Sequence, residues 1–296
     1  MSKRKSSPSS KPNRTDDEAF LFAGQEGIPS LFRYQKFRLT RHPPDRPCDC
    51  EILSDILKNH RIYCSNPLDF NDPWDCKPCL SLQALDDPKI RRETALFLIK
   101  NQRNGPRGDF MDRALLDSPL VLRRSIKAFT EYLVGFIAEH WAICCLSRDP
   151  CSILMWSYYA DNHRGICLQF AASKTNFAAA MKVKYTDNYP TFLLSSRQFQ
   201  NQMLLVKGGA WRHEQEYRMI CPTSTDTAGA KESPLILKDD FLDIGPNALE
   251  AVIVGCQTSD DVIHAVRSLI KEHSSNVKVR RAVRAPNKYT LQLEDI

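Results

Sequence analysis

Two glutamates, Glu214 and Glu216, stand two residues apart in the run "WRHEQEYR", and this spacing is the strongest chemical signal in the chain. Residues i and i+2 of a β-strand point to the same side, so the spacing predicts two neighbouring carboxylates. Burial beside a like charge raises the pKa of a carboxylate, which suits acid–base chemistry or the stabilisation of a cation. The alternative is an exposed strand face paired with Arg212 and Arg218, where each ion pair contributes about 0–1 kcal/mol.

A second candidate is the stretch "YCSNPLDFNDPWD" at residues 63–75, which is rich in Asn, Asp and Pro. Such residues often hydrogen-bond their own backbone in turns, so Asn71 and Asp72 have a purely structural interpretation. The functional interpretation is that Ser65, Asn71 and Asp72 line a pocket whose aromatic residues stack on a ligand. A third possibility is a nuclease in which Asp69, Asp72 and Asp75 bind a divalent metal.

The stretch "MWSYYADNHRG" places Trp156, Tyr159 and His163 at i, i+3 and i+7, which is one face of a helix. An aromatic face with this spacing usually belongs to the core. Each of these side chains also has a polar atom that needs a partner when buried, and a ligand is one such partner.

Familiar phosphate-binding and hydrolase motifs do not occur in the sequence. It contains no GxGxxG, GxxxxGK[ST], HExxH or GxSxG pattern. The sequence therefore offers no standard phosphate cradle, metalloprotease helix or serine-hydrolase elbow.

Hydrophobic periodicity predicts the elements that must position these residues. We expect strands at residues 31–38, 61–65, 142–147, 165–170, 181–185, 214–221, 234–238, 249–255, 277–283 and 288–294. Helices are expected at residues 50–59, in a block over about 88–140, and at residues 152–163, 191–208 and 258–274.

The mixed order of helices and strands, without steady β-α-β alternation, predicts an α+β fold with a mixed, mostly antiparallel sheet. The helical block at about 84–140 is expected to be an insertion or a cap on a single domain that spans residues 28–296.

Net charge is +6, but five of the positive charges, those of Lys3, Arg4, Lys5, Lys11 and Arg14, lie in a terminal segment without acids. The rest of the chain is nearly neutral, so nucleic acid is not indicated as a partner. The Ser-, Pro- and Lys-rich residues 1–27 are predicted to form a disordered basic tail.

No apolar run approaches the roughly 18 residues that a membrane span requires, and the N-terminus lacks the apolar part of a secretory signal. We therefore expect a cytoplasmic protein with no membrane partner. Its eleven cysteines are then free thiols in a reducing compartment. The motifs "CDC" and "CKPC" could offer four thiolates to zinc, but CxC is an atypical spacing, and no metal is expected.

The stretches "LFRY", "IYCSNPLDFNDPWD", "LMWSYYADNHRGICLQF", "VKY", "WRHEQEYRMI" and "AVIVG" occur in this order between Leu31 and Gly255. Together they resemble a bacterial family of uncharacterised proteins, the domain of unknown function 2971. This resemblance implies no activity by itself.

A weaker resemblance is to the ADP-ribosyltransferase fold, on the basis of Arg33 and Tyr34 in an early strand and the late Glu214-x-Glu216 motif. The resemblance implies that Glu216 stabilises the ribosyl cation formed from NAD, that Glu214 orients the acceptor, and that Trp156 or another aromatic residue stacks on nicotinamide. The Ser-Thr-Ser element of the arginine-type enzymes is absent, and the helical block is not part of the minimal fold.

The sequence thus leads to an ADP-ribosyltransferase-like enzyme that uses NAD and an unknown macromolecular acceptor. The rival is a non-enzymatic nucleotide- or partner-binding module of a bacterial stress or phage-defence system. The expected catalytic residues are Glu216 and Glu214. The expected cofactor-binding residues are Arg33, Tyr34, Ser65, Asn71, Asp72, Trp156, Ser157, Tyr159, His163, Trp211 and Arg218.

Overall fold

The computed structural model describes residues 20–41, 47–77, 79–100, 108–173, 175–192, 203–224, 235–273 and 276–296. An eight-stranded sheet forms its centre, in the order β14 (Leu291–Asp295), β13 (Lys278–Arg284), β12 (Leu249–Val254), β5 (Ile166–Ala171), β1 (Ser30–Gln35), β4 (Trp141–Ser147), β10 (Glu216–Pro222) and β6 (Met181–Lys182). All neighbours are antiparallel except β12 and β13. The predicted α+β class with a mostly antiparallel mixed sheet is confirmed.

Three short strand pairs accompany this sheet among the described residues. They are β2 (Arg61–Tyr63) with β11 (Phe241–Asp243), β3 (Cys79–Leu80) with β8 (Thr191–Phe192), and β7 (Lys184–Thr186) with β9 (Val206–Gly208).

The helices are α1 (Asp49–Asn59), α2 (Pro88–Lys100), α3 (Gly108–Asp117), α4 (Pro119–His140), α5 (Ile153–Tyr159) and α7 (Asp260–His273). Short segments of 3-10 helix form η1 (Pro67–Asp69), η2 (Gln83–Asp86), η3 (Asn176–Ala179) and η4 (Gly209–Glu214). In the described part of the chain, no helix combines the length and the apolar character that a bilayer span requires.

The two faces of the sheet are covered by different helices. On one face, which we name the α1/α7 face, those two amphipathic helices pack over strand residues such as Leu168 and Val252. On the opposite face, the α5 face, Trp156 of α5 packs on Tyr34 and Cys167. Because successive side chains of a strand point to opposite faces, alternate residues of each strand face α1 and α7 or face α5.

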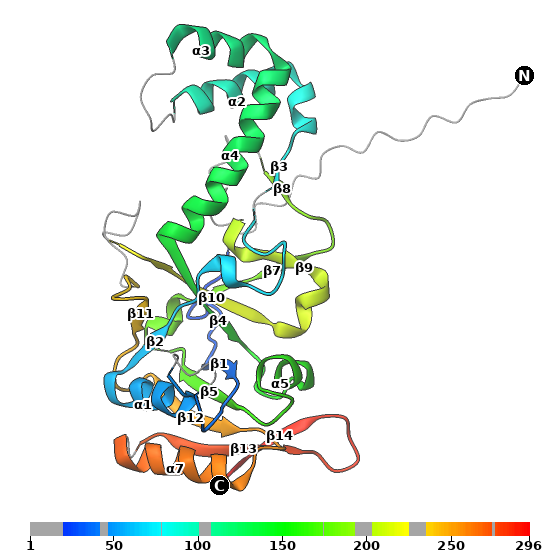
Figure 1. The fold of residues 1–296 in the computed structure, drawn as a ribbon. Coiled ribbons are helices and arrows are strands. Elements are labelled where there is room, and N and C mark those ends of the chain that lie inside the picture. Colours follow the sequence, from blue (N-terminus) through cyan, green and yellow to red (C-terminus); the bar gives the residue numbers. More distant parts are fainter. Residues whose placement is uncertain are drawn as a thin grey trace, which may run out of the picture.

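Helices α2, α3 and α4 project from one end of the sheet, away from α1 and α7 (Figure 1). They occupy the region where the helical block is predicted. Ser118 caps α4 by accepting a hydrogen bond from the Val121 amide, and Pro119 follows at the first helical position. Leu122 and Ile126 of α4 join an apolar cluster that reaches Ile143 of β4, so the block packs continuously onto the sheet. That residues 28–296 form a single domain stays a prediction.

The chain joins the fold earlier than the predicted end of the basic tail at residue 27. Residues 1–19 lie outside the described part, but residues 22–27 form a turn against the sheet. The Ala23 amide donates to the Ala180 carbonyl at 2.8 Å, and Glu26 accepts 2.6 Å hydrogen bonds from Lys182 and Tyr217. These contacts place residues 22–27 in the folded part.

The predicted helix at residues 152–163 is too long. α5 ends at Tyr159, and Asp161, Asn162 and His163 have φ values of 48°, 54° and 67°. Asn and Asp tolerate this left-handed conformation better than most residues, which allows the chain to leave the helix. His163 therefore does not continue the helical face of Tyr159.

The predicted helix at residues 191–208 is wrong at both ends. Its first residues, Thr191–Phe192, form β8, which pairs in parallel with β3. Residues 206–208 form β9, which pairs in parallel with β7 and places Lys207 opposite Tyr185. Residues 193–202 lie outside the described part of the chain.

Candidate functional site

Five buried charged side chains meet on the α5 face, where the three predicted stretches converge, and we call them the buried ion network. They come from the loop after η1, from β9, from η4 and from β10, and their exposed fractions range from 0 to 7%. The members are Asp75, Lys207, Glu214, Glu216 and Arg218.

Arg218 lies at the deep end of this network and is fully buried. Its guanidinium donates to both carboxylate oxygens of Asp75, at 2.8 and 2.6 Å, and to both oxygens of Glu216, at 2.9 and 3.0 Å. It also donates to the carbonyl of Leu204 at 2.8 Å, and it lies 5.4 Å from the ring centroid of Phe70. Arg218 therefore ties the 66–75 loop to β10.

Lys207 links the same carboxylates to Glu214. Its ammonium nitrogen lies 2.6 Å from Glu214, 3.2 Å from Glu216 and 3.4 Å from Asp75. The ammonium also lies 5.1 Å from the ring centroid of Trp211, within the range of a cation–π contact. Burial opposes the charge of Lys207, but the two glutamates outweigh it and raise its pKa.

The two glutamates meet for a reason other than strand spacing. Glu214 ends η4, Gln215 is left-handed with φ 45°, and β10 begins only at Glu216. The prediction that both lie on one strand is therefore wrong. They are brought together by Lys207, and the backbone carbonyl of Glu214 accepts a 2.6 Å hydrogen bond from Ser147.

Glu214 and Glu216 experience different electrostatic environments. Burial disfavours ionisation of Glu216, but Arg218 and Lys207 outweigh it and lower its pKa to about 2. For Glu214, burial and the charge of Glu216 raise the pKa, and Lys207 offsets them only in part. The network has three carboxylates and two cations, so it carries one net negative charge. Asp75 and Glu216 each contact both Lys207 and Arg218, whereas the ion pair of Glu214 is with Lys207.

The network approaches the surface at Tyr159. The hydroxyl of Tyr159 donates to Glu214 Oε1 at 2.6 Å and accepts a 3.4 Å hydrogen bond from the exposed Asn71. Burial raises the pKa of Tyr159, so the phenol stays protonated and can donate. Asn71 and Tyr159 thus cover the outer oxygen of Glu214, and Trp211 lies half-buried beside Lys207.

Arg33 does not belong to this site. Its neighbour Phe32 pairs with Ser147, which in turn pairs with Glu216, so Phe32 shares the face of Glu216 and Arg33 points to the opposite one. Arg33 donates to the Tyr63 carbonyl at 2.7 Å on the α1/α7 face. The prediction that Arg33 binds the same ligand as Glu216 is wrong, because their side chains lie on opposite faces of the sheet.

Tyr34 and Trp156 lie on the correct face but belong to the core. Trp156 is fully buried and donates from its indole to the Pro150 carbonyl at 2.9 Å. Tyr34 packs edge-on against it, with ring centroids 5.2 Å apart, and hydrogen-bonds the Asp149 carbonyl. Neither ring has a face free to stack on a ligand, so the cofactor role predicted for them is wrong.

The remaining predicted residues lie outside the buried ion network. Ser65 forms a backbone bridge with Ile143, and buried Asp72 accepts a 2.9 Å hydrogen bond from the Trp74 amide. The contact of Asp72 matches the structural interpretation that the sequence offered for Asn71 and Asp72. Ser157 and His163 contact each other at 3.1 Å, and their contacts in the described structure do not include the buried ion network.

Sequence reasoning missed Lys207, although it binds three carboxylates. It stands alone in the apolar run "MLLVKGG", where a single lysine is unusual enough to suggest a buried partner. The sequence suggests Asp75 only as a metal ligand, whereas its carboxylate pairs with Arg218. Within the described ranges, no group of three or more His, Cys, Asp or Glu side chains is arranged to hold a metal ion.

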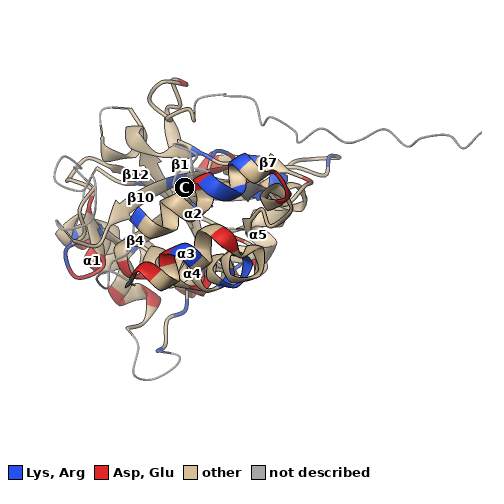
Figure 2. Cartoon of the chain, turned by 90° about the horizontal axis from the view of Figure 1, so that it is seen from above, with Lys and Arg blue, Asp and Glu red and all other residues tan. Residues whose placement is uncertain are grey.

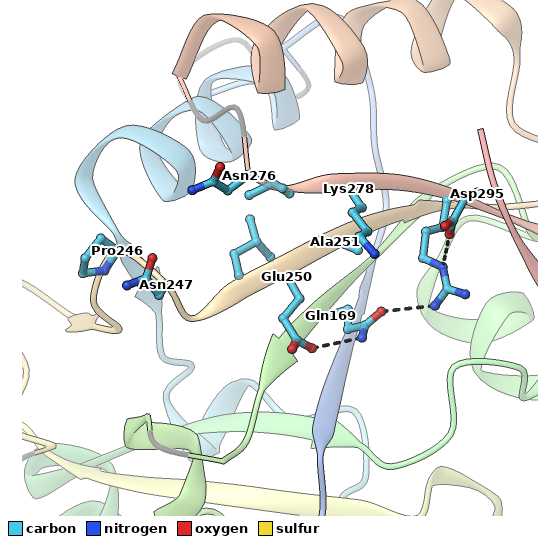
Figure 3. Close-up of a pocket in the computed structure, with 11 residues that line it drawn as sticks. Gln169, Pro246, Asn247, Glu250, Ala251, Asn276, Lys278 and Asp295 are labelled. Atoms are coloured by element: carbon cyan, nitrogen blue, oxygen red, sulfur yellow. Dashed lines mark hydrogen bonds and ion pairs between the residues drawn. The ribbon is translucent and has the colours of Figure 1, made fainter.

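A polar groove lies farther along the α5 face, at the N-terminal ends of β12 and β13, and we call it the β12–β13 groove. Its volume is about 430 Å³. Figure 3 shows a chain of contacts along its floor, from Glu250 to Gln169 (3.0 Å), from Gln169 to Arg280 (3.5 Å), and from Arg280 to Asp295 (2.9 Å). Exposed Lys278 and the amides of Asn247 and Asn276 complete the lining.

The register of the sheet relates this groove to the network. Glu216, Ser147, Phe32, Gln169, Ala251 and Lys278 are successive cross-strand partners in a single row. Five strand intervals separate the ends of this row, or roughly 24 Å at the usual spacing between strands. The network and the groove are therefore separate sites on one face of the sheet.

Basic and acidic residues are interspersed over the described helices and strands rather than gathered by sign (Figure 2). This mixture agrees with the small net charge that remains outside the N-terminal segment. All eleven cysteines are free thiols.

No curated protein and no solved structure matches this chain. A family described as a protein of unknown function (DUF2971) matches residues 155–219. The chain is therefore similar over that segment to an uncharacterised family, and the segment holds Tyr159, Lys207, Glu214, Glu216 and Arg218 of the site.

Proposed function

We propose that this protein is an ADP-ribosyltransferase-like enzyme that uses NAD as its substrate and acts in the cytoplasm. The observation that carries the proposal is the uncompensated negative charge of the buried ion network, which has three carboxylates and two cations. Departure of nicotinamide leaves positive charge on the ribose, and a fixed negative site lowers the energy of that transition state.

The two glutamates have different roles in this proposal. Both oxygens of Glu216 are engaged by Arg218 and Lys207, so Glu216 positions its neighbours rather than meeting the sugar. Glu214 Oε1 accepts its hydrogen bond from the hydroxyl of Tyr159, at the outer edge of the network. Rotation of Tyr159 would open that oxygen to a ribose, and the raised pKa of Glu214 marks it as the carboxylate least satisfied at rest.

Among the residues predicted to bind NAD, Asn71, Tyr159 and Trp211 lie where they could contact it. Trp211 is half-buried beside Lys207 and offers an aromatic surface for stacking on a base. In the reaction, the bond between ribose and nicotinamide breaks and nicotinamide leaves with the electron pair. Water or a macromolecular acceptor then attacks the ribose and releases its proton.

Nicotinamide release from NAD, measured by chromatography, tests this proposal. We expect Glu214→Gln to reduce release by on the order of a hundredfold, the effect of removing one electrostatic contact to a transition state. Glu131→Gln, at an exposed position of α4, is the matched control and should leave the rate unchanged. Release by Glu214→Gln at the wild-type rate, or no release by wild type above the protein-free blank, would reject the proposal.

A second candidate function is a non-enzymatic nucleotide-binding module, and the β12–β13 groove favours it. Exposed Lys278 lies two residues from Arg280, and the amides of Gln169, Asn247 and Asn276 line the same groove, which suits a ligand with phosphate and hydroxyl groups. We place such a module in a bacterial stress or phage-defence system. Calorimetry with ADP-ribose should then give saturable binding without nicotinamide release from NAD.

Lys278→Met should weaken that binding by about tenfold or more, because it removes a charge that faces phosphate. Lys271→Met, on the exposed side of α7, is the matched control. Equal binding by both variants would exclude the groove as the binding site.

A further inference from the structure

Three side chains from separate segments meet beside α5, away from the buried ion network. Ser157 belongs to α5, His163 to the left-handed turn after it, and Cys256 follows β12. The imidazole of His163 lies between the other two, with Nε2 3.1 Å from Ser157 Oγ and Nδ1 3.7 Å from Cys256 Sγ. All three residues are partly exposed.

The backbone fixes this arrangement. The carbonyl of His163 accepts a 3.0 Å hydrogen bond from the Gln257 amide, and a Cβ atom added at Gly255 would lie only 2.0 Å from that carbonyl oxygen. Only glycine lets the two turns approach so closely. The imidazole also lies nearly parallel to the indole of Trp156, at an angle of 14° and a centroid distance of 6.4 Å.

Hydrogen bonding determines which nitrogen of His163 carries the proton. The single hydroxyl hydrogen of Ser157 is donated to the Ile153 carbonyl at 2.8 Å. Ser157 Oγ must therefore accept from His163 Nε2–H, which leaves the lone pair of neutral His163 on Nδ1. That lone pair faces the sulfur of Cys256. Burial lowers the pKa of His163, which favours this neutral form.

We propose that Cys256 is a nucleophilic thiol, that His163 is the base that takes its proton, and that small electrophiles and low-molecular-weight disulfides react there. A nucleophile, a base and a third group that orients the base form the usual arrangement for activating a weak nucleophile. With an alkyl iodide, the sulfur–carbon bond forms, iodide leaves with the carbon–iodine electron pair, and the thiol proton passes to Nδ1. With a disulfide, one sulfur–sulfur bond breaks, a mixed disulfide forms, and a thiol is released.

Several of the other cysteines are buried. Cys64, Cys144 and Cys221 are buried, and Cys76 is enclosed by Arg218 and Asp75. Among the described residues, hydrogen bonds between a cysteine sulfur and an imidazole nitrogen are limited to Cys256.

Cys151 serves as an internal reference because it is partly exposed, as Cys256 is, and has no such imidazole contact within the described part of the chain. Burial raises the pKa of the Cys151 thiol, so its thiolate should be scarce near neutral pH.

Alkylation of the full-length protein by limiting iodoacetamide, followed by mass spectrometry of tryptic peptides, gives a rate for each cysteine. We expect Cys256 to react at least about tenfold faster than Cys151, given the usual size of base catalysis. His163→Gln should slow Cys256 by about the same factor and leave the rate at Cys151 unchanged. Oxidised glutathione should add to Cys256 with the same selectivity.

Ser157→Ala is the milder second variant in case His163→Gln lowers the melting temperature and opens the fold. It removes the hydrogen bond that fixes the tautomer of His163. The alkylation rate of Cys256 should therefore fall by roughly threefold or more. The proposal is overturned if Cys151 reacts as fast as Cys256 in the wild-type protein. It is also overturned if neither variant changes the Cys256 rate.

Discussion

Replacing Arg218 by Met tests whether the buried ion network holds the fold together. Met replaces the unbranched aliphatic part of the Arg218 side chain but not its guanidinium. The substitution therefore leaves Asp75 and Glu216 as buried carboxylates without their guanidinium partner. Breaking a buried pair in this way costs about 3–5 kcal/mol of unfolding free energy. That is a large part of the roughly 5–15 kcal/mol available to a typical domain, so the melting temperature should fall by about 10 °C.

Urea unfolding followed by circular dichroism measures this loss, with Arg267→Met on the exposed side of α7 as the matched control, expected within about 0.5 kcal/mol of wild type. Adding Asp75→Asn and Glu216→Gln to Arg218→Met removes the stranded charges and should recover more than half of the loss. A loss of unfolding free energy below about 1 kcal/mol for Arg218→Met would refute the reasoning, because removing the partner of a buried charge is strongly destabilising.

Two further predictions concern Glu216 in the buried ion network and Gly255 beside His163. The pKa of Glu216 is lowered from 4.5 to about 2 in the folded protein, so its contribution to stability is complete above pH 4.5 and is lost as the pH falls towards 2. The difference in unfolding free energy between wild type and Glu216→Gln should therefore shrink over that range, and a constant difference would contradict the assignment. Gly255→Ala should lose roughly 2–3 kcal/mol in thermal unfolding, because the new methyl group meets the His163 carbonyl at 2.0 Å. Gly135→Ala is the control, since a Cβ atom there has no contact within 4 Å, and it should be neutral or stabilising.

Local patterns were sufficient to predict the fold class. The apolar residues of the helical block recur every three or four positions, and Leu122, Ile126, Leu133 and Ile137 are all buried in α4 as that spacing requires. Two of the boundaries that failed depend on residues with unusual backbone angles. Asp161, Asn162 and His163 have positive φ values after the last residue of α5, and Gln215 has one before the first residue of β10. The hydrophobic pattern does not indicate these backbone angles, so the helix ends earlier and the strand begins later than predicted.

The candidate site could be predicted only as a set of segments. The sequence identified the stretches that converge on the network, but Arg33 and Tyr34 are adjacent and point to opposite faces, and only the strand order decides which one faces Glu216. The contacts of Lys207 could not be predicted for a similar reason. Two of its partners are seven and nine residues away, and the third, Asp75, is far earlier in the chain. Contacts of that range are set by tertiary packing, which no local pattern encodes.

The segment shared with the uncharacterised family, residues 155–219, cuts through the ion network rather than enclosing it. It carries Arg218 but not Asp75, and it carries the first residues of β10 but none of β4, the long strand beside it. A fragment trimmed to those limits would expose an unpaired guanidinium and a bare strand edge to water, and it should aggregate instead of folding. Expression boundaries for any relative should therefore begin upstream of the residue that corresponds to Asp75.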